Sequence, residues 1–368
     1  MILFLLIYRT LLRFFYFFIK LIPSKATRII FLSRQTNKPS IDFQYLINDI
    51  NQRYPEYEIK VLCKRMEKDN IKQIISYLFH PFTQMYFLAT SSICIIDSYQ
   101  ITVSCLKHKK NLKIIQIWHS LAAIKKSGLA QLKTKKEKTI AKIMCMHKNY
   151  DFIAIGSSKT AIFFSKAFAC TSEKFWITGL PRIDYLLQTK ERNKALVEKV
   201  YPELKGKKIV LYVPTFRKSN DYRFEELIKA FENTQYTLII KAHPITKEEI
   251  PEKYTYKKLT TIDFLSSADW VISDYSGTII EAATIDRPVL IFSYDYEEFS
   301  KTEGFFINIE KEFQNLSFKN AKNILSFIEA GKYDMSSLKH FRQKCIENTN
   351  GNCTRILTDK IIQTNKSF

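Results

Sequence analysis

Several common enzyme signatures are absent from the sequence. It contains no Walker-type glycine loop, no G-x-S-x-G elbow and no H-E-x-x-H motif, which argues against an NTPase, a serine hydrolase and a zinc protease. The cysteines are odd in number and include no C-x-x-C pair, so we expect reduced, mostly structural thiols in a cytoplasmic protein rather than a zinc site. No acidic pair stands out as a metal-ligand set, and we predict no metal site.

Acidic residues are scarce relative to basic ones. The chain has 57 Lys+Arg against 36 Asp+Glu, a net charge of +21, which calls for nucleic acid, anionic lipid or a phosphorylated substrate. Most aromatic residues fall in apolar runs rather than beside Arg or Gly, so nucleic acid is the weaker choice. Residues 107–148 carry many lysines against the single acid Glu137. Such a run is typical of a solvated face, but here it favours a cationic surface for an anionic membrane or a polyphosphate acceptor.

Residues 1–23, MILFLLIYRTLLRFFYFFIKLIP, are apolar enough to cross a bilayer, but Arg9, Arg13 and Lys20 interrupt the run. Their spacing places all three on one helical face. We predict an amphipathic helix lying in the headgroup region with its cations on lipid phosphates, and a membrane span is the alternative. No small-residue cleavage site follows, which disfavours a signal peptide. The aromatic stretch 77–89 is predicted as core, with a second membrane-dipping patch as the alternative.

The fold class is α/β. A chain of 368 residues, 46% of them hydrophobic, can bury two cores, and its strand and helix rhythm predicts doubly wound parallel sheets. We place the domain boundary near residues 190–206. The predicted parts are a membrane-associating helix (1–23), a Rossmann-like domain (24–195), a second Rossmann-like domain (196–330) and C-terminal helices (331–368), for which packing on the first domain is one arrangement.

The chain is organised around residues 270–294, WVISDYSGTIIEAATIDRPVLIFSY, which reads as strand, polar turn, helix and second strand. A strand that opens through a short turn into a helix leaves backbone N–H groups pointing at whatever lies above it. Gly277 would allow close approach of an anion, Ser276 and Thr278 would add hydroxyl groups, and Glu281 could reach a ribose or substrate hydroxyl. A capped helix without a ligand is the alternative.

Polar clusters follow several predicted strands: residues 118–120, 214–217, 241–244 and 274–276. In open α/β sheets this edge binds ligands, so the clusters predict a cleft between two domains. Arg217 and His243 could donate to a diphosphate, with Thr215 and Ser276 completing the anion site. His119 could take a proton from an acceptor hydroxyl. The alternatives are a core histidine at 119 and a simple pairing of Arg217 with Asp221. Together the residues describe a transferase that uses a nucleotide-diphosphate donor.

Five segments resemble, in this order, the CDP-glycerol glycerophosphotransferases that build teichoic acids: IIQIWHS, GLPRIDYL, VLYVPTFRKS, IIKAHP and DFLSSADWVISDYSGTIIEAATIDRPVLIFSYDYE. The resemblance spans roughly residues 90–310. It implies a GT-B fold, two Rossmann-like domains facing each other across a cleft, and a peripheral position on the cytoplasmic side of the cell membrane. It also implies transfer of glycerol phosphate from CDP-glycerol to a hydroxyl of a lipid-linked acceptor of the undecaprenyl-diphosphate type, with release of CMP, in synthesis of a teichoic-acid-like or capsular polymer. No cofactor is expected beyond Mg²⁺ that could accompany the donor.

The resemblance also implies residue roles: His119 as general base, His243 as a donor-diphosphate contact, and donor-site positions at Thr215, Arg217, Asp274, Ser276, Gly277, Thr278 and Glu281. Asp97, Ser120 and Arg182 are the candidates for the acceptor side. The sequence departs from the family pattern at Ser120-Leu121-Ala122, where Gly-Thr-Pro is usual, and at Leu180 and Lys218. These departures leave open the acceptor and the choice between glycerol, ribitol or another polyol. A GT-B glycosyltransferase using a nucleotide sugar and a non-catalytic lipid- or polymer-binding scaffold are the alternative functions.

Overall fold

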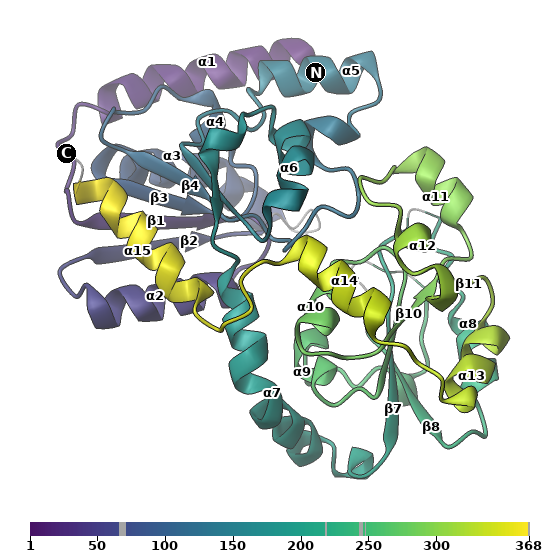
Figure 1. Cartoon of the computed structure of the whole chain (residues 1–368). Helices are drawn as coiled ribbons and strands as arrows, with labels where there is room; N and C mark the ends of the chain where they lie inside the picture. Colours follow the sequence, from purple (N-terminus) through teal and green to yellow (C-terminus); the bar gives the residue numbers. More distant parts are fainter. Residues whose placement is uncertain (66–70, 218, 243–245, 247, 367–368) are drawn as a thin grey trace. The chain divides into compact units, whose positions relative to one another are not determined.

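The computed structural model describes residues 1–65, 71–217, 219–242, 246 and 248–366. The chain forms two compact units (Figure 1): unit 1 comprises Met1–Leu121, Ser127–Tyr185 and Glu347–Phe368, and unit 2 comprises Ala122–Lys126 and Leu186–Ile346. The units divide within helix α7 (Pro181–Val200), at residues 185 and 186. The sequence prediction placed the boundary at residues 195 and 196, also within this helix.

The core of unit 1 is a parallel sheet in which the described strands have the order β2-β1-β3-β4-β5-β6. Residues Ile29 to Leu32 of its first strand are fully buried, as expected where helices cover both faces of a parallel sheet. The strands are β1 (Arg28–Ser33), β2 (Glu58–Cys63), β3 (Ile93–Ile96), β4 (Lys113–Gln116), β5 (Phe152–Ile155) and β6 (Phe175–Ile177). The helices of this unit are α1 (Ile2–Ile19), α2 (Ile41–Arg53), α3 (Ile71–Thr90), α4 (Ile101–Cys105), α5 (Lys135–Ile143), α6 (Ala161–Phe168) and α15 (Cys353–Lys366).

Unit 2 is built on a second parallel sheet, whose described strands have the order β11-β10-β9-β7-β8. The strands are β7 (Lys208–Val213), β8 (Tyr236–Ile240), β9 (Trp270–Ser273), β10 (Val289–Phe292) and β11 (Ser317–Phe318). The helices are α8 (Phe224–Phe231), α9 (Thr261–Leu265), α10 (Thr278–Thr284), α11 (Tyr296–Thr302), α12 (Ile309–Glu312), α13 (Ala321–Ala330) and α14 (Ser336–Cys345). The predicted strand, turn, helix and strand of residues 270–294 are thus β9, α10 and β10.

Both sheets reverse their winding direction at one place. In unit 2 the chain passes from β7 to β8 on one side and then crosses to β9 on the other side of β7. In unit 1 the same reversal lies between β1 and β3. Loops diverge there at the carboxyl ends of the strands, and ligands of open α/β sheets bind at this point.

Helix α1 packs on unit 1 through its cationic face. Arg9 Nη1 donates to the carbonyl of Ile143 at 2.7 Å, and Arg13 Nε donates to that of Cys105 at 2.9 Å. These carbonyls belong to the last residues of α5 and α4, where a helix leaves acceptors without intrahelical partners. The ammonium of Lys20 likewise donates to the carbonyl of Lys107. The expectation that these cations face lipid phosphates is therefore wrong, because carbonyl groups of unit 1 bind them.

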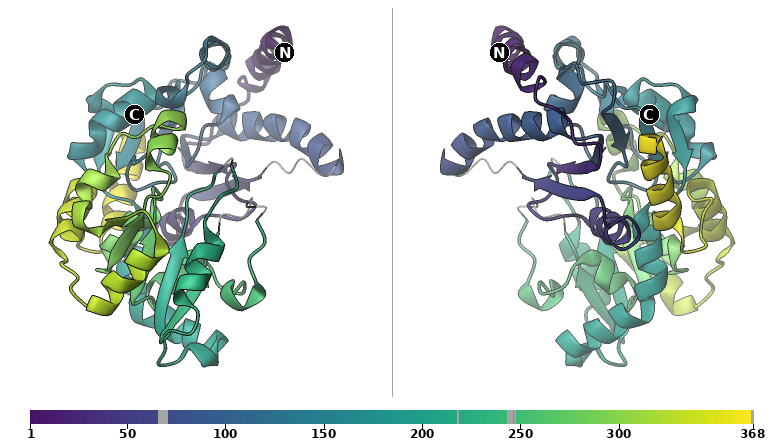
Figure 2. Two further views of the ribbon diagram at one scale, coloured as in Figure 1. Left: turned by 90° about the vertical axis from the view of Figure 1, so that its right-hand side faces the viewer. Right: turned by 90° about the vertical axis from the view of Figure 1, so that its left-hand side faces the viewer.

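The opposite face of α1 is apolar and exposed. Among the described helices, α1 alone is long and apolar enough to cross a membrane. Helix α3 lies beside it (Figure 2), and the rings of Phe15 and Phe82 meet at 5.3 Å. The stretch 77–89, predicted as core, divides between two environments: Met85, Leu88 and Ala89 are buried, whereas Phe79, Phe82 and Tyr86 are exposed.

The C-terminal residues divide between the two units. In unit 1, α15 lies beside α2 (Figure 1), and Asp359 forms an ion pair with Arg53. In unit 2, α14 packs on α10, and Arg342 donates to Asp286 at 2.6 Å. The predicted C-terminal part 331–368 is therefore not one structural element, and within it α15 packs on the first sheet's helices.

A half-buried histidine beneath α1 predicts acid sensitivity. His108 bonds to the Tyr16 hydroxyl at 2.9 Å and to the Val103 carbonyl at 2.8 Å. Burial lowers the pKa of His108 to about 4, although the Val103 bond opposes this shift. The unfolded chain, with an ordinary histidine pKa near 6.5, binds the proton first, so this stability is present above about pH 6.5 and is lost as pH falls toward 4. We expect a loss of up to about 1.4 kcal/mol per pH unit in that window.

Urea denaturation at several pH values between 7.5 and 4.5 measures this loss. His108→Gln keeps a donor and an acceptor but does not titrate, so its unfolding free energy should depend less on pH than that of the wild type. Some dependence will remain, because burial also lowers the pKa of His147 to about 4. Identical pH dependence in wild type and variant would contradict the assignment.

Candidate active site

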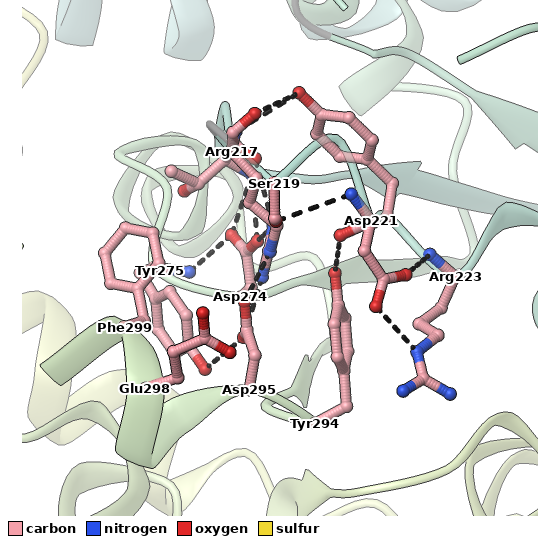
Figure 3. Close-up of polar contacts among 12 residues, drawn as sticks. Arg217, Ser219, Asp221, Arg223, Asp274, Tyr275, Tyr294, Asp295, Glu298 and Phe299 are labelled. Atoms are coloured by element: carbon pink, nitrogen blue, oxygen red, sulfur yellow. Dashed lines mark hydrogen bonds and ion pairs between the residues drawn. The ribbon is translucent and has the colours of Figure 1, made fainter. Parts of the chain in front are cut away.

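Arg217 lies at the centre of an ion-pair cluster at the carboxyl edge of the unit 2 sheet (Figure 3). Its Nε donates to Asp295 Oδ2 at 2.6 Å and its Nη2 to Asp295 Oδ1 at 3.0 Å. Its Nη1 donates to Asp274 Oδ2 at 2.5 Å and to the Thr215 carbonyl at 3.0 Å. The cluster therefore joins the residues that follow β7, β9 and β10.

The guanidinium of Arg217 is enclosed by protein. Its side chain is 2% exposed and that of Asp274 is 0% exposed. Burial alone would lower the pKa of Arg217, but Asp274 and Asp295 raise it above its usual range, so the group stays cationic. The alternative pairing with Asp221 is wrong, since Asp221 pairs with Arg223 at 3.2 Å.

Aromatic rings and a phenol complete this cluster. The Arg217 guanidinium lies 4.8 Å from the centre of the Tyr294 ring, in cation–π range. The Tyr275 hydroxyl donates to Asp295 Oδ1 at 3.0 Å. The sequence analysis missed Asp295, and it placed Tyr275 in the polar cluster 274–276 without giving it a role. Asp295 could have been found by the strand-end rule, because it closely follows β10.

The predicted anion cradle lies at the start of α10. The Ser276 hydroxyl donates to Thr278 Oγ1 at 3.1 Å and accepts from the Thr278 N–H at 3.3 Å. Gly277 has a right-handed φ of −59°, a conformation that does not require glycine. Ser276, Gly277 and Glu281 are half-buried. This turn joins the Arg217 cluster through Asp274, which accepts from the backbone N–H of Thr215 at 2.9 Å.

A short segment of the chain places Lys125 at the carboxyl edge of the unit 2 sheet. Residues Ala122–Lys126 belong to unit 2, where Lys125 pairs with Phe305 in an antiparallel bridge and the Phe306 N–H donates to the Ile124 carbonyl at 2.9 Å. Lys125 Nζ donates to Thr215 Oγ1 at 3.5 Å. Burial lowers the pKa of this ammonium, and Asp274 opposes the shift. Lys125 thus does not belong to the cationic face that was predicted for residues 107–148.

His243 lies outside the described residues. The nearby Lys241 lies at the end of β8, and its ammonium donates to the carbonyls of Tyr256 and Leu259, each at 2.7 Å. Burial lowers the pKa of Lys241 to about 8, against an opposing effect of Asp263.

In unit 1, His119 follows β4 and is exposed, so the alternative of a core histidine is wrong. Trp118 holds a left-handed φ of 52°, a costly conformation for a bulky residue that often marks functional sites. His119 Nδ1 lies 3.2 Å from the Asp97 carbonyl. Nδ1 also lies 3.4 Å from the Gln35 side-chain amide nitrogen, which can only donate. The shorter contact, to a carbonyl that can only accept, favours the proton on Nδ1 and the lone pair on Nε2.

Two further acceptor-side candidates, Arg182 and Asp97, contact His119. Arg182 Nη1 donates to the His119 carbonyl at 3.2 Å, and its Nε donates to the buried Asp42 at 2.8 Å. Asp97 is buried, and burial raises the pKa of its carboxyl group while bonds from Ser33 and Ser98 oppose the shift. Ser120, the third candidate, is half-buried beside His119. Asp42 was not identified from the sequence, where nothing distinguishes it from other residues in the first turn of a helix.

The structure thus gathers the predicted residues into two groups. Thr215, Arg217, Asp274, Ser276 and Thr278 lie at the switch point of unit 2. In unit 1, Asp97 and His119 follow strand ends, and Arg182 lies in the first turn of α7. Among the described residues, no group of three or more His, Cys, Asp or Glu side chains is arranged to hold a metal ion.

Two Rossmann-like units in one chain, with polar groups at the strand ends of each, define an α/β protein of the GT-B fold class. The model of the CDP-glycerol:poly(glycerophosphate) glycerophosphotransferase family matches residues 14–363, and the chain belongs to this family.

Similar proteins agree with this assignment. The chain is 26% identical over 360 residues to a teichoic acid ribitol-phosphate primase of Bacillus spizizenii, covering 93% of this chain and 92% of that protein. It is 24% identical over 372 residues to a teichoic acid glycerol-phosphate primase of Bacillus subtilis, covering 94% of each.

Solved structures show the same fold. A variant of the wall teichoic acid polymerase TagF superposes with a TM-score of 0.73 at 16% identity, covering 94% of this chain and 90% of that one. A UDP-N-acetylglucosamine 2-epimerase from Listeria monocytogenes superposes with a TM-score of 0.60 at 14% identity, covering 93% and 97%.

Removing the Arg217 side chain should destabilise unit 2 strongly. Arg217→Met would leave Asp274 buried without its cation, and we expect a loss of about 3–5 kcal/mol in the free energy of unfolding. Arg223→Met is the matched control, because it breaks an exposed pair with Asp221 that contributes less than about 1 kcal/mol. Urea denaturation of both variants measures the difference, and equal losses would contradict the central role of Arg217.

Proposed function

We propose that the protein transfers glycerol phosphate from CDP-glycerol to a hydroxyl group of a lipid-linked acceptor, in synthesis of a teichoic-acid-like or capsular polymer. An acceptor oxygen would attack the β-phosphorus of the donor, and the bond from that phosphorus to the CMP oxygen would break. The acceptor proton would pass to a base, and CMP would leave. The observation that carries this proposal is the family match over nearly the whole chain, together with an exposed, oriented histidine in the matched region.

His119 is the proposed base. The contact of Nδ1 with the Asp97 carbonyl leaves the lone pair on Nε2, the form that can accept a proton near neutral pH. Arg182 would act as a positioning residue, because it bonds the His119 carbonyl and its charge is matched by Asp42. Asp97 and Ser120 would border the acceptor.

The donor would bind at the switch point of unit 2. Thr215, Ser276 and Thr278 supply hydroxyl groups there, and Glu281 is proposed to contact a donor hydroxyl. His243 is retained as a proposed diphosphate contact. Arg217 and Asp274 would instead fix the strand ends, since their bonds to each other and to Asp295 occupy both groups. We propose no resident cofactor, and Mg²⁺ would enter only with the donor diphosphate.

We further propose that the protein is peripheral, on the cytoplasmic side of the membrane, and that α1 lies on the bilayer rather than crossing it. A crossing helix would have to give up the bonds of Arg9 and Arg13 to unit 1 and expose Leu12 and Tyr16, which are buried. Lying flat, the helix would keep these contacts and insert its aromatic face. The exposed lysines of the adjoining α5 region would face anionic lipid headgroups: Lys133, Lys135, Lys136, Lys138 and Lys142.

The transfer reaction is tested by release of CMP from CDP-glycerol in the presence of a short-chain lipid-disaccharide acceptor. We expect turnover with CDP-glycerol and none with UDP- or GDP-sugars. His119→Ala should lower turnover about 10²- to 10⁴-fold, the usual contribution of a general base, while CDP affinity is unchanged. His340→Ala, at an exposed histidine of α14, is the control.

Two outcomes would contradict this proposal. Full activity of His119→Ala would show that His119 is not the general base. A wild type that is inactive with every donor would favour the scaffold function. Preference for CDP-ribitol over CDP-glycerol would correct the polyol, as the ribitol-phosphate relatives allow.

The membrane contact is tested with vesicles of phosphatidylglycerol and phosphatidylcholine. Phe14 and Phe18 of α1 are exposed, and their rings contact each other edge to face with centroids 5.2 Å apart. Replacing each by Ser should weaken vesicle binding about 10-fold or more, from the lost burial of one aromatic side chain. Ile162→Ser, at an equally exposed residue of α6, is the control. Equal binding by all variants would exclude α1 as the contact surface.

A further inference from the structure

We propose that Lys125 is the cation that contacts the donor diphosphate in unit 2, in the place that the sequence pattern gives to Arg217. This inference rests on the proposed function, because it names a binding residue for the same donor. It adds a residue from a segment that lies, in sequence, within unit 1.

Arg217 cannot serve this role in the described arrangement. Its Nε, Nη1 and Nη2 atoms all donate to protein oxygens of Asp295, Asp274 and Thr215. Its side chain is almost fully buried. A phosphate could reach it only by displacing a buried carboxylate, and an arginine stripped of that partner would leave the carboxylate uncompensated.

Lys125 differs from Arg217 in two respects: its ammonium has N–H groups left to donate, and its side chain is less buried. Its ammonium lies at the carboxyl edge of β7, where it donates to Thr215 Oγ1 at 3.5 Å. Among the described residues, this 3.5 Å contact is the one hydrogen bond of the Lys125 ammonium. An ammonium has three N–H groups, so further N–H groups remain to donate. Lys125 is half-buried, whereas the Arg217 side chain is almost fully enclosed.

The ion pairs of the cluster leave the ammonium of Lys125 without a carboxylate at salt-bridge distance among the described residues. Arg217 donates to both Asp274 and Asp295, whereas Lys125 reaches a hydroxyl group. Burial and the neighbouring Arg217 lower the pKa of Lys125, while Asp274 and Glu303 oppose this. A diphosphate at the ammonium would favour its charged form and would supply the charge-assisted bonds that the Thr215 hydroxyl cannot.

Backbone hydrogen bonds fix the loop that carries Lys125. Residues Ile124 to Lys126 lie against Gly304 to Ile307, with the Lys126 N–H donating to the Gly304 carbonyl at 3.1 Å. Gly304 has a φ of 77°, and a Cβ there would lie 3.0 Å from the Lys126 side chain. A loop fixed in this way orders the lysine before ligand arrives, which lowers the entropic cost of binding.

The alternative is a purely structural lysine that neutralises Asp274. Binding measurements on the full chain separate the two roles, with CDP followed by calorimetry and cytidine by ligand-observed NMR. If Lys125 contacts the diphosphate, Lys125→Met should weaken CDP binding about 10- to 100-fold, as expected for a charge-assisted bond, and leave cytidine binding unchanged. Lys125→Arg should retain most of the CDP affinity. Lys126→Met, the exposed neighbour, should bind both ligands like the wild type.

Each outcome decides a different point. Equal losses for CDP and cytidine in Lys125→Met, or no loss for either, would overturn the role of Lys125 while leaving the proposed function standing. If Lys125→Met does not fold, Lys125→Arg and Lys125→Gln provide the same comparison, and equal CDP affinity in these two would overturn it. A wild type with no measurable CDP affinity would overturn the proposed function itself.

Discussion

The organisation of unit 2 depends on one buried cation held between two carboxylates. Taking Arg217 and Asp274 out of water costs several kcal/mol, and the arrangement is stable because Arg217 Nε, Nη1 and Nη2 all reach protein acceptors. The loops after β7, β9 and β10 are joined by this one side chain. The hydroxyl groups of Thr215 and Ser276 are held by loops that these bonds fix, so this interaction preorganises the switch point at which donor binding is proposed.

Unit 1 also contains an arginine paired with a buried aspartate. The guanidinium of Arg182 is paired with the buried Asp42 and bonds the carbonyl of His119. In both units an arginine fixed by an aspartate holds the backbone beside a candidate reactive group, where a shift of about 1 Å can cost much of the rate. The strained Trp118, packed 5.1 Å from the Phe168 ring, acts with this pair to direct His119 away from the core.

The sequence was sufficient to predict the fold and the sheet edges at which polar residues gather. Alternating runs predict two parallel sheets, and strand-end clusters predict the edges that hold Thr215, Asp274 and His119. Hydrogen-bond partners could not be predicted, because they depend on which strands are neighbours. Asp221 is close to Arg217 in sequence, but Asp295 is close in space because β10 lies beside β9. The cations of α1 were misread for a related reason: periodicity shows that they share a face, but not that carbonyl groups of α4 and α5 lie beneath it. The location of His243 stays a sequence prediction.

The path of the chain also bears on how the protein is made. Residues Ala122–Lys126 complete unit 2 by pairing with Phe305, and α15 completes unit 1 by packing on α2. During synthesis, therefore, α2 cannot pack on α15, and Lys125 cannot pair with Phe305, until these downstream segments have left the ribosome. Contacts between residues so distant in sequence form slowly and leave apolar surface uncovered meanwhile. Until α15 has emerged, the nascent chain will be exposed to aggregation or to capture by chaperones.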